Sequence, residues 1–349
     1  YFYILARSLL SEVPLLSLES SLFYFRYYLF VTCIIYFINE NKNIVFNFGF
    51  CLLLPIIILS LDAYLQLITS YNILGWKRPD SLHVTSFFGS EMILGQYIAR
   101  LTPILIATFF FYDNKQKFSN HFAAYSILIL VTSVTYISGE RTAFFLSVLS
   151  FIMFILLIRD FIKLRFIFSI SLIIIIINIS FIFPNTHNRI FNHTLTQIGY
   201  YDGNYSIFSK KYQSMYETSI KMIRDKPFFG HGPKIYREEC KKYKNSSMDP
   251  CSTHPHNFYL QLLSEIGIVG TAPFIFILLL LIKNIAMHSF AMFSSQFKEK
   301  YLYTNYEISL LIALFLTFFP LIPSLNIFNN WISIIYYLPV VFLLKLSKV

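Results

Sequence analysis

Apolar residues gather in nine long stretches of the chain, each of about the length that an α-helix needs to cross a bilayer. The stretches lie near residues 22–38, 44–70, 92–111, 121–137, 142–158, 165–183, 258–282, 304–323 and 331–346. Several are apolar on every side, as in SISLIIIIINISFIF, which is typical of helices embedded in lipid. The strands of a transmembrane β-barrel are shorter. The pattern therefore predicts an all-α, polytopic transmembrane protein.

A shorter apolar piece, YFYILARSLL, opens the chain. It is too short to cross a bilayer and lacks the cleavage pattern of a signal peptide. We interpret it as the end of a helix that begins before residue 1. The chain shows no internal repeat, low-complexity tract or soluble linker. We therefore expect residues 1–349 to form a single membrane domain that is truncated at its N-terminus.

Lysine and arginine are distributed unevenly between alternate short loops: one set carries eleven of them and the other set three. The richer set comprises Lys42, Lys115, Lys117, Arg159, Lys163, Arg165, Lys283, Lys298, Lys300, Lys345 and Lys348, and the poorer set Lys77, Arg78 and Arg141. Basic residues near span ends stay in the cytoplasm, whereas long loops cross largely regardless of charge. The bias predicts a cytoplasmic C-terminus and one large loop, residues 184–257, on the outer face.

Composition supports the membrane assignment, because 56% of the residues are hydrophobic and only 13% are charged. The net charge of +10 suggests nucleic acid, but the basic residues are dispersed along span flanks and no binding module is recognisable. Four cysteines are too few for a disulfide-dense scaffold, and no Cys/His spacing resembles a zinc site. We expect neither a nucleic-acid partner nor a metal or other cofactor.

Within the outer loop, residues 209–226 have apolar positions at helical spacing, and Pro227 ends the pattern. The apolar face comprises Tyr212, Met215, Tyr216, Ser219, Ile220 and Ile223, and the polar positions Lys211, Ser214, Glu217, Thr218, Lys221 and Arg224. This amphipathic pattern fits a surface helix packed on the outer ends of the spans. It also fits a basic lid over a site that handles anionic lipid.

Two cysteines, Cys240 and Cys251, lie in the polar part of this loop with ten residues between them. On the outer, oxidising face we expect a disulfide, although two unpaired thiols are the alternative. It would constrain the approach to His254 and His256 and contribute about 2 to 3 kcal/mol in the chain-entropy model. Cys33 and Cys51 fall inside spans, where we expect them to pack.

The next segment, THPHNFYLQLLSEIGIVG, returns the chain to the membrane. If a helix begins near His256, then Asn257, Gln261, Ser264 and Glu265 fall within about 100° of one another, with His256 beside that arc. Polar residues at a span entrance face a protein interior or a water-filled cavity, and ionisable groups there are functional candidates. We therefore interpret His256 as functional rather than structural.

Two arginines also stand out. Arg141 lies in TYISGERTAFFL at an outer turn that Gly139 permits, where an ion pair with Glu140 or a lipid headgroup is the simpler interpretation. Arg100 lies part-way along a span and needs an anionic partner, either Glu91 or the phosphate of a ligand.

The string HPHNFYLQLLSEIGIVG, in which Gly267 and Gly270 follow His256, resembles the signature of the O-antigen ligase and O-antigen polymerase superfamily of bacterial envelope enzymes. KPFFGHGPKIY, SGERTA at a span junction and FFGSEMILGQYIARLTP resemble further parts of the family pattern. The order of spans is also similar, so the resemblance covers essentially the whole chain. The chain departs from the pattern at its start. Family members usually have about twelve spans, and the first two or so would be absent here.

The resemblance implies an all-helical glycosyltransferase of the C type in the bacterial inner membrane, with its active face in the periplasm. Such enzymes are regarded as metal-independent and inverting. They take a glycan from undecaprenyl pyrophosphate and join it to a hydroxyl of lipid A core, as ligases do, or of another repeat unit, as polymerases do.

These residues suit that chemistry. Arginine can stabilise a departing pyrophosphate without a metal, and we assign this role first to Arg141, then to Arg189 and Arg100. His256 matches the general base that takes the proton of the acceptor hydroxyl. Glu265 has an orienting role or a buried hydrogen bond. The expected substrate-binding set is completed by His254, His231, Asn257, Gln261, Lys211 and Arg224, although His231 within GHGP equally suits a turn cap and the basic residues equally suit solvated charges.

Three other interpretations remain open. The polymerase shares the ligase signature, and the single basic loop with one histidine motif favours the ligase. A flippase or transporter of lipid-linked sugars would also need cations inside the membrane, but the chain lacks the paired, Gly/Pro-broken helices of two related halves. A purely structural membrane scaffold is the third class.

Overall fold

A computed structural model describes residues 1–41, 43–111, 117–197, 199–201, 204–206, 208–244, 251–294, 301–320, 322–324, 326–328 and 330–346. The chain divides into two compact units. Unit 1 combines Tyr1–Ile35, Thr196–Ile282 and Phe318–Val341, and unit 2 combines Tyr36–Leu195, Lys283–Thr317 and Phe342–Val349.

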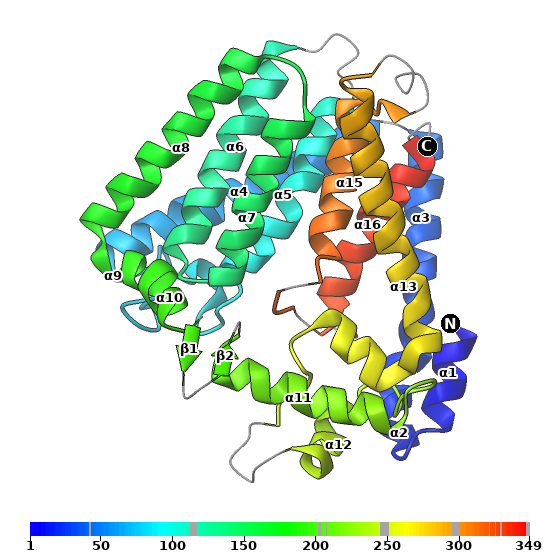
Figure 1. Ribbon diagram of the computed structural model, residues 1–349. Helices are drawn as coiled ribbons and strands as arrows, with labels where there is room; N and C mark the ends of the chain where they lie inside the picture. Colours follow the sequence, from blue (N-terminus) through cyan, green and yellow to red (C-terminus); the bar gives the residue numbers. More distant parts are fainter. Residues whose placement is uncertain are drawn as a thin grey trace. The chain divides into compact units, whose positions relative to one another are not determined.

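The protein is an all-helical membrane protein, as the apolar pattern predicts, and each of the nine stretches contains a helix (Figure 1). Among the described residues, six helical segments are long and apolar enough to cross a membrane. They are Pro14–Glu40, α4 (Asn43–Thr69), α5 (Leu94–Phe111), α6 (Phe118–Ile137), α8 (Ile162–Ile182) and α13 (Phe258–Ala291). The other three stretches form the shorter helices α7 (Arg141–Leu157), α15 (Asn305–Thr317) and α16 (Asn330–Leu346).

In unit 2, α5 lies at the centre and packs against α4, α6, α7 and α15. Most of its residues are buried, including Arg100. The opposite extreme is α8, whose large apolar side chains, such as Phe166, Ile170 and Ile174, are exposed. An apolar helix with an exposed apolar surface is suited to contact with lipid. Two cysteines in these helices are exposed: Cys33 in α3 (Arg26–Glu40) and Cys51 in α4. The packing role expected for them is therefore wrong.

Hydrogen bonds in unit 2 join loops that the predicted topology places on the same side of the membrane. Residues 70–93 reach the turn before α7 through the hydrogen bond from Val84 N to Ser138 O. A second group is joined by the bond from Asn305 Nδ2 to Asp160 Oδ2, beside a capping box at the start of α15. Five lysines of the predicted cytoplasmic set lie outside the described residues: Lys42, Lys115, Lys298, Lys300 and Lys348. The side of the membrane on which each group lies stays a prediction.

Unit 1 contains the helices α1 (Phe2–Leu9) and α2 (Pro14–Ser21), followed by the 3₁₀ turn η1 (Leu22–Phe25) and the start of α3. The expected outer loop is helical over much of its length, with α9 (Pro184–His187), the π-helical turn η3 (Asn188–Asn192) and α10 (His193–Gln197). In unit 1 it continues as α11 (Lys210–Asp225) and α12 (Tyr236–Tyr243). A small antiparallel hairpin, β1 (Gly199–Tyr201) and β2 (Asn204–Ser206), is the structure's addition to the expected all-α fold.

The helix α13 is not the single continuous helix that the sequence predicts. It is interrupted at Gly267, whose φ is 67° and ψ is −174°, and Figure 1 shows the bend. An interruption exposes backbone groups that lipid cannot satisfy. The segment after α11 satisfies them: Ser264 O and Glu265 O accept from His231 N and Gly232 N, at 2.9 and 2.7 Å. On the other side of the break, Ile268 N and Val269 N donate to Pro227 O and Phe228 O.

The break needs glycine on both of the segments that meet there. A Cβ on Gly267 would lie within 2.3 Å of Phe228 O, and one on Gly230 would lie 2.5 Å from the backbone carbon of Glu265. Both glycines also have positive φ. The glycines of KPFFGHGPKIY and SEIGIVG therefore permit one close backbone contact between these two segments.

Candidate functional site

His256 lies at the point where the outer loop turns into α13. Its φ of 55° is the left-handed conformation, which histidine adopts more readily than most side chains. Its carbonyl accepts a hydrogen bond from Ser324 N at 2.8 Å, and its Nε2 lies 3.1 Å from Ser252 Oγ. The ring is half-buried and meets the ring of Tyr212 edge-on at 5.7 Å. The backbone and the ring are thus held by residues from three segments of unit 1.

The environment of His256 favours its neutral form. Burial lowers its pKa below the ordinary value, and the nearby ammonium group of Lys211 lowers it further. The ring of His254 lies 4.1 Å away. His254 is buried, and burial together with His256 lowers its pKa to about 3. Two adjacent neutral imidazoles result, and His256 is the more exposed of them.

The predicted polar arc is buried and hydrogen-bonded, so it does face the protein interior. Asn257 begins α13 as its N-cap, because its Oδ1 accepts from Tyr259 N and Leu260 N, both at 3.1 Å. Its amide also donates to Pro320 O at 3.0 Å. The described contacts therefore give Asn257 a structural function.

Gln261 and Glu265 continue this network one and two turns later. Gln261 Nε2 donates to Asn326 Oδ1 at 2.8 Å and to Glu265 Oε2 at 3.2 Å. Glu265 Oε1 accepts from Tyr236 N at 3.2 Å, at the start of α12. Both side chains are fully buried. For Glu265 the structure favours the buried hydrogen bond among the expected alternatives.

The amphipathic helix expected over residues 209–226 is α11, and it ends before Pro227. Its buried face differs from the expected one, because Thr218 and Met222 are buried whereas Ile220 is exposed. The face follows the i, i+3, i+4, i+7 positions from Met215. Lys211 and Arg224 are exposed on this helix.

The disulfide joins Cys240 and Cys251, whose Cα atoms lie 5.9 Å apart. Cys240 packs with Met222 and Tyr236, so the bond ties the chain before His254 to the buried side of α11 and α12. His231 is also fully buried there: its Nε2 lies 3.1 Å from Met222 O, and burial lowers its pKa. These contacts support the turn-capping alternative for His231.

Arg141 is the first residue of α7 in unit 2, at a turn formed by Gly139 with φ of 73°. The preceding Glu140 accepts hydrogen bonds from Gly95 N at 2.6 Å and Gln96 N at 3.2 Å, at the start of α5. Arg189 Nε donates to Gly139 O at 3.3 Å. The structure thus brings Arg189 to the turn that carries Arg141.

Arg100 is buried in α5, with 2% of its surface exposed. Its Nε donates to Gln96 Oε1 at 3.3 Å, one turn earlier in the same helix. The suggested partner, Glu91, is exposed and lies before the helix begins. Gln96 is therefore a partner of Arg100 that sequence reasoning missed.

Other neighbours of the histidine turn were missed too. Ser252 lies four residues before His256, and Tyr212 was assigned only to the apolar face of α11. Ser324 and Asn326 lie between two stretches expected to be helical, 304–323 and 331–346, and α15 ends at Thr317. The serine in CSTHPH was visible as a neighbour of the histidine, whereas nothing local marks residues 318–328 as a partner.

Residues 126–275 match the model of a protein family described as O-antigen ligase. This segment is therefore similar to an O-antigen ligase domain. The match includes the Arg141 turn, the outer segment, His256 and the two glycines Gly267 and Gly270. No curated protein and no solved structure matches the chain.

This match supports the predicted resemblance to the O-antigen ligase and polymerase superfamily. Members of the O-antigen ligase family are glycosyltransferase-like enzymes, which implies a lipid-linked glycan and an acceptor as substrates. In this chain the residues expected to carry the chemistry form two groups. His256 and its neighbours belong to unit 1, and Arg141, Arg189 and Arg100 belong to unit 2.

Proposed function

We propose that the protein is an O-antigen ligase-like glycosyltransferase. It moves a glycan from undecaprenyl pyrophosphate to a hydroxyl of lipid A core, on the periplasmic face of the bacterial inner membrane. The observation that carries this proposal is the environment of His256, a half-buried imidazole whose pKa is lowered, inside the O-antigen ligase match.

In this proposal His256 is the general base. The acceptor oxygen attacks the anomeric carbon of the donor sugar, and its proton passes to His256. The bond between that carbon and the pyrophosphate oxygen breaks, and the configuration at the carbon inverts. A base must be unprotonated before the reaction, and the lowered pKa of His256 meets this requirement at neutral pH.

Arg141 and Arg189 stabilise the departing pyrophosphate in the same proposal, with Arg100 as a third contributor. Guanidinium groups bind phosphate oxygens bidentately and stay charged, so the step proceeds without a metal. The hydrogen bond from Arg189 to Gly139 O supports a joint role, because it holds a second guanidinium beside the Arg141 turn.

The remaining candidates support the substrates or the base. We propose that exposed Lys211 and Arg224 attract the anionic lipid carrier and that His254 lies against the sugar or diphosphate. His231, Asn257, Gln261 and Glu265 fix the shape of this region through their buried hydrogen bonds.

Transfer to another repeat unit, as a polymerase performs, is the alternative within the same chemistry. A reconstituted assay separates the two functions. Purified protein in proteoliposomes receives undecaprenyl-pyrophosphate-linked oligosaccharide and either lipid A core or a second repeat unit. Product on lipid A core supports the ligase, whereas elongation of the lipid-linked glycan would make the protein a polymerase.

The variants His256→Asn and Arg141→Ala test the two roles. Asparagine tolerates the left-handed backbone at residue 256, so His256→Asn removes the base without adding backbone strain. We expect His256→Asn to lose about 10² to 10⁴ in rate. Arg141→Ala should lose about 10² to 10³, the range found when one donor to a developing oxyanion is removed.

Matched controls are the exposed residues His193 and Arg159, which lie outside both groups. His193→Ala and Arg159→Ala should keep their rates within about twofold, because neither removes a group assigned to the reaction. Full activity of His256→Asn would refute the base assignment. If wild-type protein glycosylates neither acceptor, the transferase proposal fails and a flippase of lipid-linked sugars becomes the leading alternative.

A further inference from the structure

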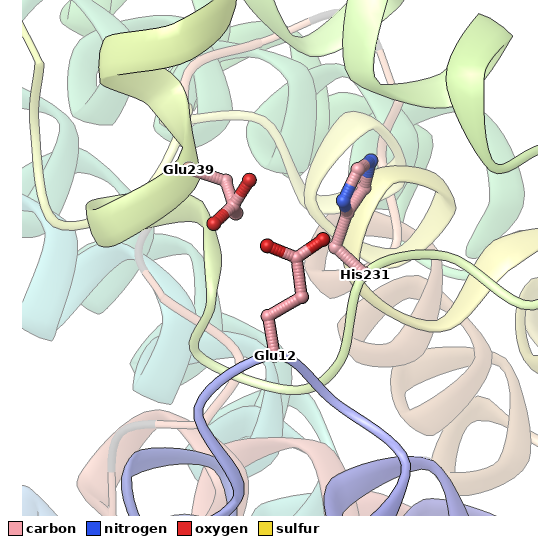
Figure 2. Close-up of side chains that lie close together, drawn as sticks. All are labelled: Glu12, His231 and Glu239. Carbon is pink, nitrogen blue, oxygen red and sulfur yellow. The ribbon is translucent and has the colours of Figure 1, made fainter.

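Three side chains that could bind a cation meet in unit 1, and the proposed transfer reaction uses none of their ligand atoms. Glu12 lies in the turn between α1 and α2, His231 in the glycine turn after α11, and Glu239 in α12. One ligand atom from each lies within 4.8 Å of the others. Figure 2 shows the Glu12 carboxylate between the Glu239 carboxylate and the His231 ring.

The free imidazole nitrogen of this cluster is Nδ1. His231 Nε2 lies 3.1 Å from the Met222 carbonyl and 3.8 Å from Asp225 Oδ2. Both of those atoms can only accept, so Nε2 carries the hydrogen and Nδ1 of the neutral ring has a lone pair. Nδ1 is buried and makes no hydrogen bond within the part of the chain that the structure describes. A backbone carbonyl that fixes the tautomer in this way is typical of histidines that bind metals.

Glu239 contributes a second buried atom without a partner. Its side chain is 5% exposed, and its Oε2 makes no hydrogen bond to any described residue. A carboxylate oxygen and an imidazole lone pair are both acceptors, so neither can satisfy the other. Leaving such groups buried and unsatisfied costs free energy, which a proton or a metal cation between them would offset. Glu12, whose side chain is 42% exposed, leaves one side of the cluster open to solvent.

Two lysines neutralise part of this charge without completing the site. Lys226 Nζ and Lys242 Nζ each lie 2.8 Å from a Glu12 oxygen, and Lys242 Nζ is also 2.8 Å from Glu239 Oε1. They leave His231 Nδ1 and Glu239 Oε2 unsatisfied. Their side chains are 39% and 59% exposed, so they are able to rotate into solvent when a cation binds.

We propose that Glu12, His231 and Glu239 form a binding site for a divalent transition-metal ion of the Zn²⁺ type. One imidazole nitrogen and two carboxylate oxygens suit such an ion, and the open side leaves room for water as a further ligand. The ion joins the α1–α2 turn to the turn at Gly230–Gly232, which carries His231, and to α12, beside the disulfide at Cys240. Its function is to brace these three segments, and glycan transfer does not involve it.

Direct metal binding tests the site independently of transferase activity. Full-length protein with Cys33→Ser and Cys51→Ser, which removes the two free thiols, is purified in detergent, freed of any tag and treated with chelator. Zn²⁺ is then titrated in competition with a chromophoric chelator, and the bound metal is counted by mass spectrometry. We expect one equivalent per chain and a rise in the thermal unfolding midpoint when Zn²⁺ is added.

Three variants and a matched control identify the ligands. His231→Gln keeps a donor for the Met222 carbonyl but removes the Nδ1 lone pair, and Glu239→Gln removes a carboxylate. Each should weaken binding at least about tenfold, as the loss of even an outer partner does at known sites. Lys242→Gln removes a competing cation and should tighten binding. Glu19→Gln neutralises an exposed carboxylate that pairs with Lys234 and is not a ligand of the proposed site, so it should leave affinity unchanged.

The gain of affinity in Lys242→Gln is a result that a purely structural ion-pair network would not produce. It also keeps the test decisive if His231→Gln unfolds without metal. Saturable binding that is the same in the parent protein, His231→Gln and Glu239→Gln would overturn the proposal. Absence of saturable Zn²⁺ binding in the parent protein and in Lys242→Gln would also overturn it.

Discussion

At the residue scale, the two histidines of the THPH turn differ in exposure although their rings lie only 4.1 Å apart. Protonation of both would place two like charges at short range in a partly desolvated site. Burial lowers the pKa of His254 to about 3 and also lowers that of His256. His254 therefore remains neutral at every physiological pH. His256, which is half-buried and faces Tyr212, is the one suited to exchange a proton with a substrate.

The first prediction concerns the pH dependence of transfer. Because only neutral His256 accepts a proton, kcat/KM should rise with pH, and the midpoint of this rise should lie below the ordinary histidine pKa of about 6.5. The positive charge of Lys211 disfavours protonated His256, so Lys211→Gln should raise the pKa and move the acid limb to higher pH. The pH profile of kcat/KM for the two proteins measures this difference.

Lys163→Gln is the control, because Lys163 is an exposed lysine at the start of α8 and its loss should not move the acid limb. The shift separates an electrostatic role of Lys211 from simple substrate attraction. Attraction alone would change KM at every pH and leave the position of the limb unchanged, which would contradict the prediction.

At the element scale, the interruption of α13 determines how the segment after α11, residues 227–232, packs against that helix. Four backbone hydrogen bonds between residues 227–232 and 264–269 replace those that a continuous helix would make. Buried irregular backbone of this kind is tolerated only where protein covers it. The two glycine motifs noted in the sequence therefore have a physical function, because they bring this cover into contact with the break.

The second prediction tests that contact with a pair of glycines. Gly267 and Gly89 both have positive φ, but only at Gly267 would a Cβ meet backbone atoms, whereas nothing lies within 4 Å of one at Gly89. Gly89→Ala should cost about 1 to 3 kcal/mol through its backbone conformation alone. Gly267→Ala adds a steric clash of about 1 to 3 kcal/mol. Its thermal unfolding midpoint in detergent should therefore fall further, and equal effects would show that the contact does not stabilise the fold.

At the scale of the whole molecule, the sequence locates the helices because lipid requires long apolar segments, and this requirement is local. A helix lies in each of the nine expected stretches, and α11 ends before Pro227 and the polar arc from Asn257 to Glu265 is buried, as the patterns predict. The tertiary partners are different. The bond from Gln261 to Asn326 joins residues 65 positions apart, and no periodicity encodes it.

The same reasoning explains the incorrect expectations. Helical periodicity located α11 but not its buried face, because residues from elsewhere in the fold decide that face. Met222, for example, is buried against Tyr236 and Cys240. The charge of Arg100 suggested an acidic partner, although Gln96 one turn away is within reach. The chemistry assigned to His256 and Arg141 came from family resemblance, and the structure adds the environment of each residue.

The last prediction concerns the orientation of the chain in the membrane. The uneven distribution of Lys and Arg between alternate short loops predicts that the α11 segment lies in the periplasm and the loop before α8 in the cytoplasm. In protein carrying Cys33→Ser and Cys51→Ser, we introduce a single cysteine at exposed Lys221 in α11 or at exposed Lys163 in α8. A maleimide that cannot cross the inner membrane should label Lys221→Cys in spheroplasts, and Lys163→Cys only after the membrane is permeabilised. The reverse pattern would place the His256 turn in the cytoplasm, where a periplasmic acceptor could not reach it, and would exclude the proposed ligase reaction.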